Sequence, residues 1–158
     1  MTSGLLDSLR QAAPGLETGE CSGNPAAGCS ASHVCPSAQV PSAARAFKEA
    51  GYLLEMLTCL DRRARGEGFQ IIYHFSKADI TDRHRLRAGV SPGEEPPSLA
   101  ELFESANWYE REVYDMFGVR FAGHPDMTRI LTEEGADYHP LLKDFGVAPP
   151  GETGDGDA

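Results

Sequence analysis

Two neighbouring segments that alternate between apolar and polar residues constrain the fold of this chain more than any other feature. The apolar residues of each segment share one face: Phe69, Ile71, Tyr73 and Phe75 in the first, and Leu86, Ala88 and Val90 in the second. A period of two is typical of a strand with one buried face. Residues 77–82 separate the segments, an ordinary length for a hairpin loop. We therefore predict an antiparallel pair of strands over residues 69–76 and 83–90.

A helix is predicted to begin at Val40-Pro41-Ser42. Proline suits the first turn of a helix, where its missing N–H would have no partner. Gly51 interrupts the apolar face of this helix and is expected to end it. Residues 57–60 fit either a helix or a buried strand, and residues 33–39 are predicted to hold a short strand. Leucines between residues 5 and 9 could form one short helix in an otherwise loose segment.

A further helix is predicted to begin at Ser98, because Ser98 and Glu101 have the spacing of a capping box. It is expected to run, in one or two pieces, to Phe117. Gly118 follows at the position where a left-handed C-cap is needed. Residues 119–121 can add a short strand. Beyond Gly123 proline and glycine recur and no periodic pattern remains.

These patterns predict an α+β fold, with a small antiparallel sheet, helices on one of its faces and an extended C-terminal arm. The predicted parts are a flexible N-terminal segment (1–31), an α+β domain (32–123), an extended partner-docking arm (124–150) and a disordered acidic tail (151–158). The arm keeps scattered apolar residues between its prolines, which is typical of a chain lying on a partner.

The charge of the chain limits its partners. With 24 acidic and 14 basic residues, its net charge is -10, which argues against binding nucleic acid or an anionic membrane surface. No run approaches the roughly 20 apolar residues of a membrane span, and no secretory signal is evident at the N-terminus. A cytoplasmic protein is expected, with its four cysteines reduced. Arg83, Arg85 and Arg87 form a basic stripe, either a solvated face or a docking strip for an acidic partner.

The stretch from Asn107 to Asp126 (NWYEREVYDMFGVRFAGHPD) carries the most specific motif. Farther on, Arg129 precedes Ile130-Leu131, and residues 139–145 read HPLLKDF. At these spacings the chain resembles the 30 kDa subunit family of respiratory complex I (the C-type subunit of NADH-quinone oxidoreductase), which also occurs in membrane-bound nickel-iron hydrogenases. The likeness covers roughly residues 40–146 and implies a buried strand ending at Asp61.

The resemblance implies a non-catalytic structural subunit in the peripheral arm of a proton-translocating NADH:quinone oxidoreductase. Such a subunit would dock on the 49 kDa-type (D-type) subunit and neighbouring iron–sulfur subunits, on the cytoplasmic side of the membrane. It would carry no cofactor; NADH, FMN, iron–sulfur clusters and quinone would bind to other subunits. The alternative within the family is the equivalent subunit of an energy-converting nickel-iron hydrogenase.

The residues that match the family signature are the expected docking residues. They are Glu110, Arg111, Glu112, Asp115, Phe117, Gly118, Phe121, Gly123, His124, Pro125, Asp126, Arg129, His139, Pro140, Leu141, Lys143 and Asp144. Arg111 and Asp115 stand four positions apart and can pair on one helix face, either in solvent or in a network buried against the arm or a partner.

The sequence also contains residues that could suggest two other kinds of site. Glu110 and Glu112 lie about 200° apart around a helix, so they cannot act together as an acid–base pair. Cys21, Cys29, His33 and Cys35 could supply four ligands to zinc, which would make the chain a stand-alone metal-binding module. Their spacing matches none of the usual zinc motifs, so no metal site is expected.

Overall fold

The computed structural model describes residues 3–19, 28–80 and 82–146. The α-helices are α1 (Ser3–Ala12), α2 (Val40–Glu49) and α3 (Glu104–Phe117). The strands are β1 (Glu17–Gly19), β2 (Ala31–Val34), β3 (Leu53–Asp61), β4 (Phe69–Ser76) and β5 (Arg83–Val90). Short 3₁₀ turns, η2 (Ser37–Gln39) and η3 (Arg63–Arg65), precede α2 and follow β3.

The strands form a single five-stranded sheet in the order β1-β2-β5-β4-β3. The predicted hairpin is confirmed with its bounds, and β4 pairs with β5 from Phe69 opposite Val90 to Ser76 opposite Arg83. The α+β class is also confirmed. The sheet is mixed, however, because β2 runs parallel to β5, and the prediction of a purely antiparallel sheet is wrong on this point. A parallel neighbour needs a long connection, which no local pattern reveals.

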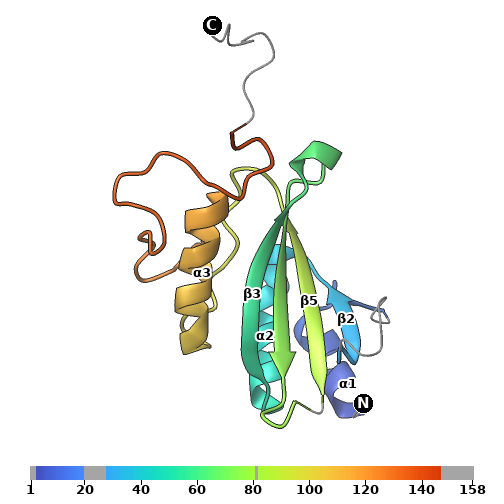
Figure 1. Ribbon diagram of the computed structural model, residues 1–158. Helices are drawn as coiled ribbons and strands as arrows, with labels where there is room; N and C mark the ends of the chain where they lie inside the picture. Colours follow the sequence, from blue (N-terminus) through green and yellow to red (C-terminus); the bar gives the residue numbers. More distant parts are fainter. Residues whose placement is uncertain (1–2, 20–27, 81, 147–158) are drawn as a thin grey trace, which may run out of the picture.

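The core lies between the sheet and the helices behind it (Figure 1). Phe47 of α2 stacks on Phe75 of β4 with ring centroids 4.4 Å apart. Helix α1 packs on α2 and buries Leu5 and Leu9. Part of the N-terminal segment predicted to be flexible is thus ordered in the core, because its leucines recur on one helical face. Residues 20–27 of that segment lie outside the described residues.

Two buried histidines, His33 and His84, lie inside this core, and only His33 was named from the sequence, as a candidate metal ligand. His33 Nε2 and His84 Nδ1 are 2.9 Å apart, and the Thr18 hydroxyl lies 3.0 Å from His33 Nδ1. Asp82 receives a hydrogen bond from the Tyr52 hydroxyl and lies 3.2 Å from His84 Nε2. Burial, reinforced by the neighbouring His84, lowers the pKa of His33 to about 4, so this network holds neutral imidazoles at pH 7.

Helix α3 lies beside β3 (Figure 1). Its side chains reach the edge strand directly, since Ser105 and Tyr109 donate hydrogen bonds to the carbonyls of Leu54 and Glu55. Gly118 ends α3 in a left-handed conformation, as predicted. The beginning of α3 differs from the prediction: the helix starts at Glu104, not at Ser98.

The arm follows α3. Its described part, residues 124–146, contains no helix or strand and runs back along α3 (Figure 1). The rest of the predicted arm and the acidic tail, 147–158, lie outside the described residues. Residues 119–121 form no strand, and a single bridge between Pro97 and Ala122 stands near them. None of the helices in the described part of the chain has the length and hydrophobicity to span a bilayer.

Candidate functional site: an arm clipped to a helix

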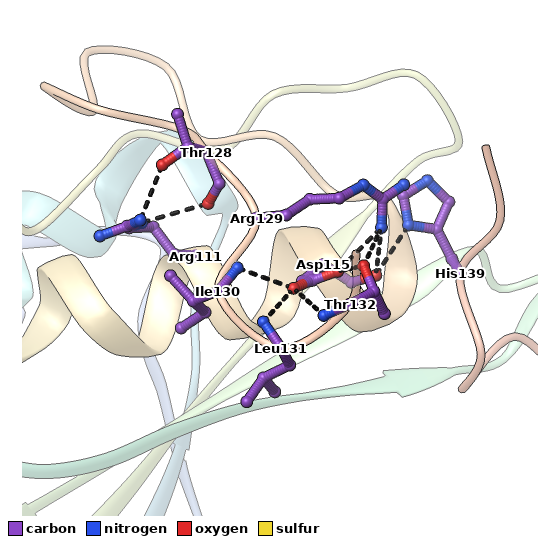
Figure 2. Close-up of polar contacts among 8 residues, drawn as sticks. All are labelled: Arg111, Asp115, Thr128, Arg129, Ile130, Leu131, Thr132 and His139. Atoms are coloured by element: carbon purple, nitrogen blue, oxygen red, sulfur yellow. Dashed lines mark hydrogen bonds and ion pairs between the residues drawn. The ribbon is translucent and has the colours of Figure 1, made fainter. Parts of the chain in front are cut away.

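Asp115, in the last turn of α3, is the centre of the contact between the helix and the arm (Figure 2). One of its carboxylate oxygens accepts hydrogen bonds from three successive backbone N–H groups, at 2.9, 2.7 and 3.1 Å: those of Ile130, Leu131 and Thr132. The other oxygen accepts the Thr132 hydroxyl at 2.5 Å and Arg129 Nη1 at 2.8 Å. Five donors therefore surround one buried carboxylate.

This arrangement fixes the charge of Asp115. Burial alone would favour the protonated acid, but the hydrogen bonds from Thr132, Leu131 and Ile130 hold the pKa of Asp115 well below its usual range. The carboxylate therefore stays ionised and attached to the arm. Asp115 was predicted to be a docking residue, but in the structure its carboxylate accepts hydrogen bonds from the arm of the same chain.

Arg111 does not pair with Asp115, and the predicted pairing four residues apart is wrong. The guanidinium of Arg111 donates to the Thr128 carbonyl at 3.1 Å and to its hydroxyl at 2.7 Å (Figure 2). It also lies 5.0 Å from the ring centre of Trp108. Arg129 takes the place that Arg111 was expected to fill, because the arm brings Arg129 to the carboxylate.

The arm makes further contacts with the C-terminal end of α3. His139 Nδ1 donates to the Asp115 carbonyl at 2.9 Å, and the Leu141 N–H donates to the Met116 carbonyl at 3.1 Å. These bonds satisfy carbonyls that a helix end leaves without partners. A Cβ on Gly118 would lie 2.9 Å from the His139 ring, so glycine is required there for space as well as for its left-handed conformation.

A second clip holds the arm at the end of β3. Asp61 has a buried side chain that accepts Arg63 Nη2 at 2.8 Å and the Lys143 N–H at 2.9 Å. Arg63 reaches on to Asp144 at 2.7 Å. The hydrogen bond from Arg63, opposed by burial, keeps the pKa of Asp61 well below its usual range. This clip was not predicted, because nothing near Asp61 in the sequence indicates a partner about eighty positions away.

Glu110 anchors the other side of α3. It is fully buried and accepts the Ser98 hydroxyl at 2.5 Å and the Leu99 N–H at 2.6 Å. Burial raises the pKa of Glu110 to about 7, although these two bonds oppose the shift. His124 Nε2 lies 3.9 Å away and donates to the Asn107 carbonyl. The hydroxyl of Ser98, which was expected to cap the helix, thus donates its hydrogen bond to Glu110 instead.

The remaining predicted residues divide into buried and exposed groups. Phe121 is buried, while Phe117 and Pro140 are half-buried. The exposed residues of the signature are Glu112, Gly123, Pro125, Asp126, Leu141, Lys143 and Asp144. The exposed apolar side chains of this region, which are candidates for contact with a partner, are Trp108, Leu131, Leu141 and Phe145. We call these four residues the arm-side apolar surface.

The described members of the Cys21, Cys29, His33 and Cys35 set form no metal site. Cys21 lies outside the described residues, and His33 faces Thr18 and His84 with its two ring nitrogens. Cys29 is disulfide-bonded, so the expectation of four reduced cysteines, which rested on compartment alone, is wrong for it. Cys35 is free and buried, and burial raises its thiol pKa to about 11. In the described ranges no group of three or more His, Cys, Asp or Glu residues could hold a metal ion.

A cavity of about 560 Å³ lies between Tyr114 of α3 and the arm around residues 127–136. Its charged lining residues are Arg129 and Glu134. Arg129 is already bound to Asp115, and no second carboxylate of the lining stands beside Glu134 to form an acid–base pair. Through Arg129 this cavity adjoins the Asp115 clip that holds the arm.

The fold and the two carboxylate clips define an α+β module whose C-terminal arm is fastened along its last helix. The sequence profile described as "Respiratory-chain NADH dehydrogenase, 30 Kd subunit" matches residues 33–150. The chain belongs to this family.

Individual relatives agree with this assignment. Over 89 residues, 56% of this chain, it is 48% identical to the C-type subunit of the NADH-quinone oxidoreductase of Rhodopseudomonas palustris (strain BisB18) and 47% identical to that of Rhodobacter capsulatus. It is also 43% identical to the mitochondrial NADH-ubiquinone oxidoreductase 30.4 kDa subunit of Neurospora crassa. The match spans 45% of each bacterial relative and 31% of the fungal one, so the chain aligns with less than half of their lengths.

Solved structures share the fold. The trypsin-resistant fragment (1–134) of Nqo5 superposes with a TM-score of 0.63 at 28% identity, covering 78% of this chain and 96% of that one. A chain of the membrane-bound sulfane sulfur reductase, an archaeal respiratory membrane complex, superposes with a TM-score of 0.73 at 22% identity, covering 91% and 85%. At that identity the second likeness concerns the fold alone.

Proposed function

We propose that this chain is a non-catalytic structural subunit in the peripheral arm of a proton-translocating NADH:quinone oxidoreductase. In this role it docks on the 49 kDa-type subunit, beside the iron–sulfur subunits, and supports electron transfer to quinone by holding its neighbours in place. The name shared by relatives 43–48% identical to it supports this assignment. NADH, FMN, iron–sulfur clusters and quinone are bound by other subunits, and the chain lies on the cytoplasmic side of the membrane.

The observation that carries the docking role is the arm-side apolar surface. Leu131 and Trp108 are 61% and 60% exposed. The backbone of Leu131 is held by the Asp115 clip, and Trp108 lies against Arg111, which binds Thr128 of the arm. Large apolar side chains held rigidly in solvent are typical of a protein interface. The clip orders this surface before a partner arrives, which lowers the conformational entropy lost on binding.

The docking role is tested with the tagged full-length chain expressed in its native cells. Leu131→Asp and Leu141→Asp place charges on the arm-side apolar surface and keep every side chain of the two clips unchanged. We expect the amount of co-purifying 49 kDa-type subunit to fall on the order of tenfold, since burying one unpaired charge in an interface costs more than about 1.4 kcal/mol. Ile80→Asp, at an equally exposed apolar residue in the β4–β5 loop, is the matched control.

Cutting the chain after Ala122 removes the whole arm and should abolish co-purification. Normal assembly of the truncated chain and of both aspartate variants would contradict the docking role. Composition of the purified complex separates the alternatives. A nickel-containing large partner would indicate the hydrogenase form, and zinc bound to the isolated chain would indicate a metal-binding module instead.

A further inference from the structure

The sheet has a second face that no described helix covers. Helices α1 and α2 lie behind the sheet, and the opposite face is open toward the viewer (Figure 1). The register places Val34, Arg87, Ile72 and Thr58 in one row across strands β2, β5, β4 and β3. Residues opposite one another in paired strands point to the same face. A neighbouring row contains Ser32, Arg85, His74 and Met56.

Two arginines stand in the middle of this face, which we call the open sheet face. Arg85 and Arg87 are two positions apart on β5, so their side chains emerge about 7 Å apart on the same side. Each is half-buried between neighbouring strands, and the Nε atoms of both are buried without a hydrogen-bond acceptor among the described residues. Buried donors of this kind normally have a partner.

The acidic groups of this face do not satisfy these arginines. Glu55 binds Arg83 through two hydrogen bonds of 2.8 Å. Glu17, on β1, lies opposite Val34 of β2 and is therefore two strands away from Arg87 of β5. Strands are about 4.8 Å apart, so Glu17 is roughly 10 Å from Arg87 at the backbone. In a chain of net charge -10, Arg85 and Arg87 therefore form a local basic site to which the described residues supply no counter-ion.

The surroundings of the two arginines indicate the kind of ligand. Apolar residues border them: Val34 and Ile72 beside Arg87, and Met56 and Leu60 toward the edge strand, 40% and 42% exposed. Arginine forks match carboxylates through paired N–H donors. A nucleic acid or a lipid headgroup would meet apolar side chains beside the two arginines and a strongly acidic molecule around them. A polypeptide with carboxylates flanked by apolar side chains matches both features.

We propose that the open sheet face is a second docking surface, at which Arg85 and Arg87 bind Asp or Glu side chains of a partner polypeptide. This surface is separate from the arm-side apolar surface, which lies along α3 and the arm. The chain would then bridge two neighbours, one through its arm and one through its sheet. The inference rests on the proposed function only in assuming that the chain works inside a larger assembly.

The first experiment uses the full-length chain in the complex isolated from its native cells. An Arg85→Lys, Arg87→Lys variant keeps the charge and introduces amines that a carbodiimide joins to carboxylates in direct contact. We expect mass spectrometry to find these amines linked to an acidic segment of another polypeptide. Linkage only to Glu17 or Glu55 of the same chain, or no linkage, would overturn the proposal. So would loss of the contact on treatment with nuclease, or binding of the isolated chain to anionic vesicles through these arginines.

The second experiment reverses the charge. Arg85→Glu with Arg87→Glu should lower retention of the linked polypeptide on the order of tenfold or more, because each like-charge contact opposes binding. Lysines placed at the linked carboxylates should restore retention. Arg10→Glu with Arg45→Glu, at exposed residues of α1 and α2, makes the same charge change away from this face. Equal retention by both double variants would contradict the proposal.

The two docking surfaces can be separated in the same preparations. If the linked polypeptide is lost while the 49 kDa-type subunit remains bound, the open sheet face is an independent interface. If Leu131→Asp releases its partner and the Arg85 and Arg87 variants change nothing, only the present inference fails. If the Arg85 and Arg87 variants release the linked polypeptide and Leu131→Asp changes nothing, the docking role of the arm is contradicted and the open sheet face is supported.

Discussion

Asp115 has five donors on one carboxylate, so its loss should affect the protein more than the loss of any exposed acid. Asp115→Asn keeps the shape of the side chain but removes its charge, and it leaves Arg129 half-buried without an anion. We expect the free energy of unfolding to fall by about 3 kcal/mol, as for other broken buried pairs. Urea unfolding of the full-length chain measures this change.

Asp137→Asn is the control for this substitution. Asp137 is exposed in the same arm and makes no hydrogen bond to the described residues, so its change should stay within about 0.5 kcal/mol. Equal stability of the two variants would show that the clip contributes nothing to folding.

Glu110 gives a pH dependence of known sign. Its pKa is about 7 in the folded chain, above the ordinary 4.5, so the folded state holds a proton that the unfolded state releases. The contribution of protonated Glu110 to the free energy of unfolding is fully present below about pH 4.5 and is lost as the pH rises through about 7. Glu110→Gln removes this titration. As the pH rises from about 5 to 8, the free energy of unfolding of the variant should therefore increase by on the order of 2–3 kcal/mol relative to that of the natural chain.

The measurement is urea unfolding across that pH range, with Glu112→Gln as the control. Glu112 is exposed on the same helix, so its removal should shift the stability curve without changing its shape. A constant difference between the Glu110→Gln variant and the natural chain at every pH would disprove the assignment of the titration to Glu110.

Helix α1 is the element whose role in stability sequence analysis underestimated. Leu9 has no exposed surface and belongs to the core, whereas Leu6 on the same helix is partly exposed. Leu9→Ala should lower the free energy of unfolding by about 2–4 kcal/mol, the usual cost of a cavity in a core. Leu6→Ala should cost less than half as much. Thermal or urea unfolding checks both, and equal small effects would mean that α1 is loosely attached.

Elements defined by local periodicity were predictable from the sequence. The β4–β5 hairpin and the beginning of α2 follow from alternation and from Pro41, and the end of α3 follows from Gly118. The start of α3 was not predictable, because Glu110, twelve positions away, binds Ser98 and displaces the local capping box. Strand β2 also depends on a distant partner, because it pairs in parallel with β5. The same holds for β3, whose leucines also fit a helical face but which pairs with β4.

The candidate site divides in the same way. The charged residues of α3 and the arm could be identified as a set from their motif, but their partners could not. Arg111 binds Thr128, and Arg129 binds Asp115, since the path of the arm decides which side chains meet. The pairing of Asp61 with Lys143 has no local signal at all.

At the scale of the whole molecule, the arm is fastened at two distant points. Asp115 holds residues 129–132, and Asp61 holds residues 143–144 together with Arg63. Each clip keeps the other segment near its site, which raises the effective concentration for rebinding. Little of the arm is buried, so its attachment depends mainly on these polar contacts.

This arrangement predicts cooperative release of the arm. In Asp61→Asn or Asp115→Asn alone, the remaining clip should retain most of the arm. The Asp61→Asn, Asp115→Asn double variant should lose hydrogen-exchange protection at Ile130, Leu131, Thr132 and Lys143 by more than the two single effects combined, because rebinding then has no tether. Amides of β4 should keep their protection, since the sheet forms its core without the arm. Additive losses would show that the clips act independently, and simultaneous loss in β4 would show that arm and domain unfold as one unit.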